Sequence, residues 1–368
     1  MRFPEFSGEW KMCTIGELTT KVGSGVTPRG GEAVYKTEGH PFVRSQNVGL
    51  GNLLLDDIAF IDEETHLRQK NTELQFNDVL LNITGASIGR SALVDKQIVG
   101  GNVNQHVCII RTKENLVPSF ICSFLLSNYG QRQIDSFQAG GNRQGLNFEQ
   151  IKSIKITIPS KDEQIKIAKL LRAIDERIAT QNKIIDKLQS LIKGIAQNVA
   201  CNNKPNIRLS ECLKCSSSTL QESDVCENGT YPVYGANGIV GYLNNYNTEK
   251  EAVYIIKDGS GVGTVSYVTG KCSATGTLNT LQAKEGYSLQ YLYYMLKVFN
   301  FETYKTGMAI PHIYFKDYGK AKIFCPSYTK QLKYVGLLSA IDNKLSAEQS
   351  ILTDLRLQKQ YLLRQMFI

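Results

Sequence analysis

A long stripe of apolar residues runs through the middle of the chain. From Ile167 onward, apolar side chains recur at alternating steps of four and three residues, and Gln181 takes one polar place in the series. A sustained repeat of this kind keeps one face of a helix against a partner helix, as in a coiled coil. We therefore expect a helix over residues 161–200, with its seam at Ile167, Leu171, Ile174, Ile178, Ile185, Leu188, Ile192 and Ile195.

A second stripe of the same period occupies residues 329–368. Here Glu348 takes the polar place that Gln181 holds in the first stripe, and a polar seam residue commonly fixes helix register at some cost in stability. The alternative is that each helix is amphipathic and covers only its own domain, but the regularity lasts more than four heptads. The apolar seam positions of the second stripe are Leu338, Ile341, Leu345, Leu352, Leu355 and Leu362.

The two stripes belong to a repeat of the whole chain. The residues Pro159, Gln164, Leu170, Leu171, Ile174 and Asp175 return 167 positions later as Pro326, Gln331, Leu337, Leu338, Ile341 and Asp342. A period of this length is too long for a solenoid and fits a duplicated unit of one domain followed by one helix.

Helix length then predicts the direction of pairing. Residues 163–200 as one helix span roughly 55 Å at about 1.5 Å per residue. The short connection after it, residues 198–204, reaches at most about 25 Å even when extended. It cannot return along the helix, so we expect antiparallel helices with one globular part at each end and a pseudo-two-fold axis between them.

The two globular parts also share an internal order. Residues 79–94 and 253–268 each place β-branched runs on both sides of a glycine-rich tip, which predicts a hairpin in each. The tip Gly259-Ser-Gly-Val-Gly263 is no dinucleotide fingerprint, because strand-forming residues follow it instead of a helix. A helix should follow each hairpin, over residues 119–126 and 289–298. A loop and a closing strand should come next, over residues 140–148 and 307–315, with different polar residues in each copy.

Composition describes a globular chain that contains no membrane span. Hydrophobic residues make up 42% and charged residues 21% of the 368 residues, and the start lacks the apolar run of a signal peptide. Nine scattered cysteines favour reduced thiols, so we expect a cytoplasmic protein. Cys212 and Cys215 form a CxxC without the second pair that a zinc site needs. The net charge of +8 permits a nucleic-acid partner without requiring one.

The sequence offers no catalytic constellation. GxSxG, Walker A and HExxH motifs are all absent, and no two prolines are adjacent as they would be in the NPP[FY] motif of amino-methyltransferases. The four histidines are isolated from one another in sequence. We therefore expect a chain that performs no chemistry by itself and binds neither cofactor nor metal.

The repeated pattern Pro-x4-Gln-x5-Leu-Leu-x2-Ile-Asp resembles that of the specificity subunits of type I restriction–modification systems. The segments Phe3-Pro-Glu-Phe-Ser-Gly-Glu-Trp10 and Gln358-Lys-Gln-Tyr-Leu-Leu-Arg-Gln-Met-Phe367 also resemble that family, so the resemblance covers the whole chain. It implies an α+β fold of two duplicated target-recognition domains separated by two long antiparallel coiled-coil helices. The corresponding limits are 1–160 for the first domain, 161–200 for the central helix, 201–328 for the second domain and 329–368 for the last helix.

The resemblance also implies partners. The helices would dock two methyltransferase subunits, which bind S-adenosylmethionine, and motor–nuclease subunits would join for restriction. The target would be a bipartite site on double-stranded DNA, with two half-sites that are read and a spacer that is not.

Loop residues suited to DNA contact occur in both globular parts. Arg and Lys read guanine, Asn and Gln read adenine, and Ser and Thr join them on phosphates. In the first part the candidates are Arg29, Arg44, Ser45, Gln46, Asn47, Thr84, Ser87, Arg90, Asn142, Arg143 and Gln144. In the second they are Lys257, Ser260, Thr264, Lys305, His312 and Tyr314.

Two other functions remain open at this point. One is a protein-binding scaffold with two heads on a coiled-coil spacer, and the other is the recognition subunit of a different DNA methyltransferase system. Steep salt dependence of DNA binding would separate DNA recognition from the scaffold.

Overall fold

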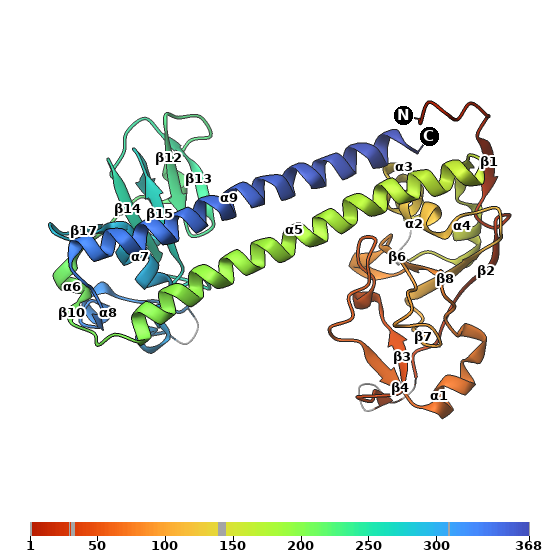
Figure 1. Ribbon diagram of the computed structural model, residues 1–368, viewed down its shortest axis with the longest axis horizontal. Coiled ribbons are helices and arrows are strands. Elements are labelled where there is room, and N and C mark those ends of the chain that lie inside the picture. Colours follow the sequence, from red (N-terminus) through yellow and green to blue (C-terminus); the bar gives the residue numbers. More distant parts are fainter. Residues whose placement is uncertain (1, 29, 31–33, 139–144, 308–309, 368) are drawn as a thin grey trace. The chain divides into compact units, whose positions relative to one another are not determined.

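A computed structural model describes residues 2–28, 30, 34–138, 145–307 and 310–367. Its contacts divide the chain into two units. Unit 1 comprises residues 1–181 and 351–368, and unit 2 comprises residues 182–350. Each unit therefore combines one half of the central helix with the opposite half of the last helix (Figure 1).

The described residues of unit 1 form three small sheets and four short α-helices. A four-stranded sheet has the order β2-β8-β5-β6, a three-stranded sheet the order β4-β3-β7, and β1 pairs with β9. The strands are β1 (Lys11–Thr14), β2 (Thr19–Ser24), β3 (His40–Val43), β4 (Ala59–Ile61), β5 (Val79–Asn82), β6 (Ser91–Leu93), β7 (Asn102–Val103), β8 (Val107–Thr112) and β9 (Lys155–Ile158). The short helices are α1 (Glu63–Arg68), α2 (Pro118–Leu126), α3 (Asn128–Ser136) and α4 (Phe148–Ser153).

Unit 2 repeats this sheet plan. Its sheets have the orders β11-β17-β14-β15 and β13-β12-β16, and β10 pairs with β18. The strands are β10 (Ile207–Arg208), β11 (Leu213–Ser217), β12 (Tyr231–Gly235), β13 (Gly238–Leu243), β14 (Glu251–Ile256), β15 (Val265–Thr269), β16 (Ser273–Ala274), β17 (Leu278–Ala283) and β18 (Lys322–Ile323). The short helices are α6 (Leu209–Cys212), α7 (Leu289–Lys297) and α8 (Phe315–Tyr318).

Both predicted hairpins are present. β5 pairs antiparallel with β6, and β14 pairs antiparallel with β15. The strand β15 follows the tip Gly259–Gly263, where a dinucleotide fingerprint would require a helix. The helices α2 and α7 also occur where the sequence predicts them.

The two closing strands predicted over residues 140–148 and 307–315 are wrong in their described parts. Gly145 and His312 form only isolated bridges, and helices α4 and α8 begin at Phe148 and Phe315. The start of α4 has a local cause, because Asn147 and Gln150 form a capping box there. The strands that close each unit come later, as β9 and β18.

The predicted long helices are α5 (Lys161–Cys201) and α9 (Tyr328–Gln365). The predicted seam positions are buried or half-buried in both, including the polar residues Gln181 and Glu348, which are 8% and 6% exposed. Fully burying one Leu or Ile contributes about 1.5–3 kcal/mol, so a seam of this length is a major stabilising feature. The residues predicted for the seam therefore lie on the buried or half-buried face of each helix.

Within unit 1 the end of α9 joins the main core. Leu362, Met366 and Phe367 belong to one buried cluster with Ile167, Leu171 and Ile174 of α5. Phe367 lies 5.2 Å from the ring of Phe120 in α2. In addition, Lys359 Nζ lies 2.6 Å from Asp175 Oδ1. The last turns of α9 thus pack on the first turns of α5, as antiparallel pairing requires.

The core of unit 2 is rich in tyrosine. A buried tyrosine needs a partner for its hydroxyl, and each of the four largest here has one. The pairs are Tyr254 with Thr248 at 3.0 Å, Tyr291 with the carbonyl of Phe324 at 2.9 Å, Tyr294 with Asp342 at 2.7 Å, and Tyr318 with Asn279 at 3.1 Å. Burial and the Asp342 carboxylate raise the pKa of Tyr294 well above its usual value, so its hydroxyl donates to that carboxylate.

Candidate nucleic-acid interface

Both units present a hairpin tip that is held against a later loop in the same way. In unit 1 the amide of Leu146 donates to the carbonyl of Ile83 at 2.8 Å, and Thr84 bridges Gly145. In unit 2 the amide of Ile313 donates to the carbonyl of Lys257 at 2.9 Å, and Asp258 bridges His312. The two contacts are equivalent in the sequence repeat. We call this hairpin tip and the loop hydrogen-bonded to it the frame. The backbone of the frame is equivalent in the two units, whereas its side chains differ.

In unit 1 a short series of hydrogen-bonded polar side chains lies beside the hairpin tip. Thr84 Oγ1 lies 2.6 Å from His106 Nδ1, and His106 Nε2 lies 3.0 Å from Gln105 Nε2. Because the Gln105 amide nitrogen donates, Nε2 accepts and Nδ1 carries the proton that it donates to Thr84. Gln105, at the end of this hydrogen-bonded series, is exposed and can contact a ligand. Neither Gln105 nor His106 was among the residues predicted from the sequence.

Asn82 joins the hairpin to a neighbouring loop. Its Nδ2 donates to the carbonyl of Ser45 at 2.8 Å and to Ser87 Oγ at 3.0 Å, and its side chain is fully buried. Two residues that the sequence predicts as DNA contacts, Ser45 and Ser87, are therefore held side by side. Asn82 itself ends the apolar run of β5, and this polar exception is the signal that could have identified it.

Asp57 holds the other side of that loop. Arg44 Nη2 donates to the Asp57 carbonyl at 2.7 Å and lies 3.5 Å from Asp57 Oδ2. Asn47 Nδ2 donates to Asp57 Oδ1 at 2.9 Å, and Gln46 donates to the same carboxylate. Asn47 is fully buried, so in this conformation it positions the loop and presents nothing to a ligand, whereas Gln46 is exposed.

Of the remaining candidates in unit 1, only Arg90 is among the residues that the structure describes. Arg90 is half-buried beside the tip, where its amide donates to the carbonyl of Ser87 at 3.2 Å. Four predicted residues lie outside the described residues, namely Arg29, Asn142, Arg143 and Gln144.

In unit 2 the frame gathers most of the predicted residues. The amide of Gly259 donates to the carbonyl of Pro311 at 2.9 Å, which brings the tip bearing Lys257 and Ser260 against the loop bearing His312. The ring of Tyr314 lies 5.1 Å from that of His312, and Lys316 Nζ lies 5.1 Å from the Tyr314 ring centre. Lys316 was not predicted, and it makes this surface basic and aromatic.

Two predicted residues contribute differently. Lys305 forms an ion pair with Glu302 at 2.6 Å, so its charge is partly neutralised in this conformation. Thr264 is exposed at the far side of the tip, where its amide donates to the carbonyl of Gly261 at 3.0 Å. The DNA-contact roles of all these residues stay predictions.

Another basic and aromatic cluster lies on the smaller sheet of unit 2. Lys271 Nζ is 4.8 Å from the ring centre of Tyr246 and 5.9 Å from that of Tyr231. A hydrogen bond with Tyr246 raises the pKa of Lys271. These residues are far apart in sequence, so no local sequence motif predicts that they form a cluster.

Two histidines that are distant in sequence stack in unit 1. The rings of His40 and His66 are 3.8 Å apart and 5° from parallel. His40 Nε2 lies 2.6 Å from Glu63 Oε2, and His66 Nδ1 lies 2.8 Å from Asn102 Oδ1. The hydrogen bond with His40 lowers the pKa of Glu63, so its carboxylate stays charged.

The described residues contain no group of three or more His, Cys, Asp or Glu side chains placed to hold a metal ion. Cys212 is buried, and desolvation raises its pKa to about 12, which disfavours the thiolate that a metal needs. Nor does any helix in the described part of the chain have the length and apolar character needed to cross a membrane.

Comparison with known proteins decides the family. A family model described as the type I restriction modification DNA specificity domain matches residues 7–190 and again residues 206–356. The chain belongs to this family. The resemblance seen in the repeated helix motif is thereby confirmed, and the chain is a DNA-recognition component of a type I restriction–modification system.

Individual relatives agree with this assignment. A Mycoplasma genitalium protein named as the type I specificity subunit S.MgeORF438P is 25% identical over 320 residues, which cover 79% of this chain and 81% of that protein. The EcoKI specificity subunit of Escherichia coli K12 is 22% identical over 202 residues, covering 52% of this chain and 41% of that protein.

Solved structures share the fold. The crystal structure of the S subunit from M. genitalium matches with a TM-score of 0.66 at 19% identity, covering 100% of this chain and 99% of that one. The expected α+β fold, with two repeated domains and a long helix between them, is thus confirmed. Nothing in these comparisons supports the scaffold or the other methyltransferase system that the sequence left open.

Proposed function

We propose that this specificity protein reads a bipartite site on double-stranded DNA, with each unit reading one half-site. The observation that carries the proposal is the repeated frame, in which the Ile83–Leu146 and Lys257–Ile313 contacts are equivalent while the exposed side chains differ. Two equivalent frames with different polar groups suit two different base sequences. The chemistry of these groups agrees, since Gln, Lys, Ser and Tyr all contact bases or phosphates.

We further propose that α5 and α9 dock two methyltransferase subunits, and that motor–nuclease subunits join the complex for restriction. Exposed apolar side chains on these helices support a docking role. Leu357 and Tyr361, four residues apart on α9, are 58% and 53% exposed, and Leu191 on α5 is 48% exposed. Leu357 and Tyr361 fall on the face opposite the seam at 3.6 residues per turn, where a solvent-facing helix would carry polar residues.

The chain itself performs no catalysis under this proposal and needs no cofactor. S-adenosylmethionine binds to the methyltransferase subunits. Calorimetry tests this point directly. The chain alone should show no heat of S-adenosylmethionine binding, and detectable affinity would contradict the assignment of the cofactor to the partner.

DNA binding by the reconstituted complex tests the main proposal. Neutralisation of six to ten phosphates would lower affinity about 10³- to 10⁵-fold between 50 and 200 mM salt. Exchange of residues 205–328 for those of another specificity protein should change one half-site and leave the other intact. A target that changes at both half-sites, or at neither, would contradict the assignment of one half-site to each unit.

A further inference from the structure

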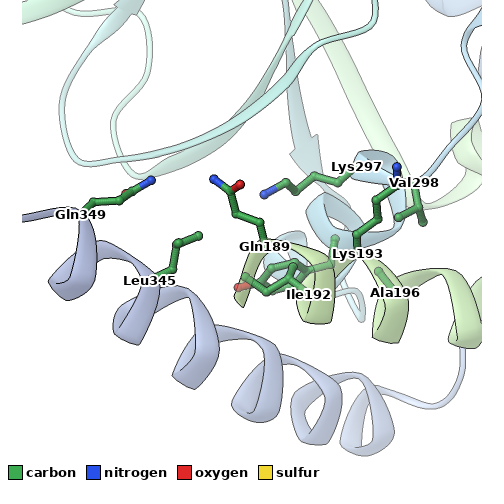
Figure 2. Close-up of a pocket in the computed structure, with 9 residues that line it drawn as sticks. Gln189, Ile192, Lys193, Ala196, Lys297, Val298, Leu345 and Gln349 are labelled. Carbon is green, nitrogen blue, oxygen red and sulfur yellow. The ribbon is translucent and has the colours of Figure 1, made fainter. Parts of the chain in front are cut away.

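A pocket of about 400 Å³ lies in unit 2 between α5, α7 and α9. Its floor includes the seam residues Ile192 and Leu345. Gln189, Lys297 and Gln349 point toward one another over this floor, and Lys193 also lines the pocket (Figure 2). The pocket thus combines an apolar base with a polar, cationic rim.

The residues that line the pocket carry a net positive charge. No carboxylate is among the pocket residues, and neither Lys193 nor Lys297 forms an ion pair within the described parts of the chain. Lys297 Nζ instead lies over the ring of Tyr293, 5.1 Å from its centre. Two lysines on the rim of an apolar floor favour an occupant that carries both a carboxylate and an apolar side chain.

The equivalent place in unit 1 is filled by the chain itself. The helices α2 and α7 are equivalent, because Gln164 accepts from the amide that precedes α2 as Gln331 accepts from the amide that precedes α7. In unit 1 the loop between β3 and β4 reaches this place at Gly51. A Cβ atom on Gly51 would lie 3.6 Å from Leu126 of α2 and 3.7 Å from Lys359 Nζ of α9.

The described residues of unit 2 form no such loop. Its equivalent strands β12 and β13 are joined by two residues, Ala236 and Asn237, whereas residues 44–58 join β3 to β4. A two-residue turn cannot reach the long helices. The place that a polypeptide loop covers in unit 1 therefore remains open in unit 2.

We infer that this pocket receives an acidic, partly apolar peptide segment of a docked partner protein. The occupant is taken to be a peptide because a peptide loop fills the equivalent place in unit 1, and acidic because Lys193 and Lys297 lack carboxylate partners. The inference rests on the proposed docking of two methyltransferase subunits to the long helices. It adds that the two docking sites are unequal, since unit 2 alone offers this anchor among the described residues.

Charge reversal in the pocket tests the inference with the purified methyltransferase subunit as the probe. The double variant Lys193→Glu/Lys297→Glu should bind one copy with unchanged affinity and the other at least about tenfold more weakly, as measured by native mass spectrometry across a titration. The matched control is Lys250→Glu/Lys320→Glu, which places the same charges on exposed positions of unit 2 outside the two long helices and the pocket, and it should bind both copies normally. Gln189→Trp, which fills the pocket from its exposed rim without changing charge, should reproduce the loss of one copy.

Each result decides a separate point. Two copies bound by the pocket variants with the affinity of the unmodified chain would overturn the inference and leave the proposed docking intact. If the pocket variants bound both copies equally weakly, the inference that the two docking sites differ would be wrong. An unmodified chain that binds no methyltransferase subunit would overturn the proposed docking itself. Melting temperatures of all variants should match the unmodified chain, because the altered side chains are exposed.

Discussion

Gln331 makes in unit 2 the same two hydrogen bonds that Gln164 makes in unit 1. Each side-chain carbonyl accepts from the amide just before a short helix, Val117 in one unit and Ser288 in the other, both at 2.9 Å. Each side-chain nitrogen donates to the carbonyl of the proline five residues earlier, at 3.1 and 2.8 Å. Both glutamines are 1% exposed. They clamp the start of each long helix to the domain that precedes it.

We predict that Gln164→Ala and Gln331→Ala each lower the free energy of unfolding by about 1–3 kcal/mol, because each leaves a buried amide without its acceptor. Urea unfolding would measure the loss. Gln197→Ala, at an exposed position of α5, is the matched control and should stay within about 0.5 kcal/mol. Equal stability of all three variants would mean that the clamp contributes nothing.

The seam gives a second prediction. Leu171 is 2% exposed in the shared core of α5 and the end of α9, so Leu171→Asp would bury a carboxylate without a partner and should destabilise by several kcal/mol. Ala173→Asp places the same residue on an exposed face of the same turn and should cost less than about 1 kcal/mol. Similar melting temperatures for the two variants would remove the argument for a buried seam.

Cysteine reactivity provides a third prediction. Burial raises the pKa of Cys108 to about 12 and those of Cys122 and Cys325 to about 11, so these thiols stay protonated at pH 8. Cys201 and Cys226 are exposed. A thiol reagent should therefore modify Cys201 and Cys226 rapidly in the folded protein, and all nine cysteines after unfolding. A Cys201→Ser/Cys226→Ser variant that kept the rapid phase would contradict this assignment.

The contact between His40 and Glu63 predicts a pH dependence. Because the folded protein lowers the pKa of Glu63, chiefly through the hydrogen bond with His40, this carboxylate stabilises the fold above its unfolded pKa of about 4.3. That contribution is lost as pH falls through the lower folded value. Glu63→Gln should lower the melting temperature at pH 7, and the difference should be smaller at pH 3. Glu38→Gln, at an exposed position, is the control and should show no such difference at either pH.

A fifth prediction concerns the distance between the half-sites. If paired helices hold the units rigidly, one added base pair moves the second half-site by about 3.4 Å and rotates it by about 34°. Twisting the DNA to compensate costs on the order of kcal/mol, so a spacer one base pair longer or shorter should lose at least about tenfold in affinity. A flexible tether would accept several spacer lengths. Near-equal affinities across a spacer series would therefore contradict the rigid spacer.

Sequence alone was sufficient for the features that depend on period and repetition. The seams of α5 and α9 follow from a 4-3 spacing that each helix carries within itself. The duplication follows from residues such as Gln164 and Gln331, whose equal positions reflect equal contacts. Both hairpins were predictable because alternating strands on either side of a glycine-rich tip are a local pattern.

The closing strands show where local reasoning failed. Residues such as Ile313 and Phe315 have strand-forming character, yet a turn of helix begins at Phe315 because the tertiary fold places the pairing strand later, at β18. Strand pairing joins residues far apart in sequence, and propensity alone does not decide which apolar run receives a partner.

What the sequence determined by itself is therefore the doubled plan of the chain, its two long helices and its family. Only the tertiary structure decided which polar side chains of the loops are exposed to a ligand and which are hydrogen-bonded within the protein. Asn47 is buried on Asp57, His106 donates to Thr84, and His40 stacks on His66, and the partners in each pair are ten or more positions apart in the sequence. Such contacts have no period and no fixed spacing, because they depend on where folding brings distant loops together.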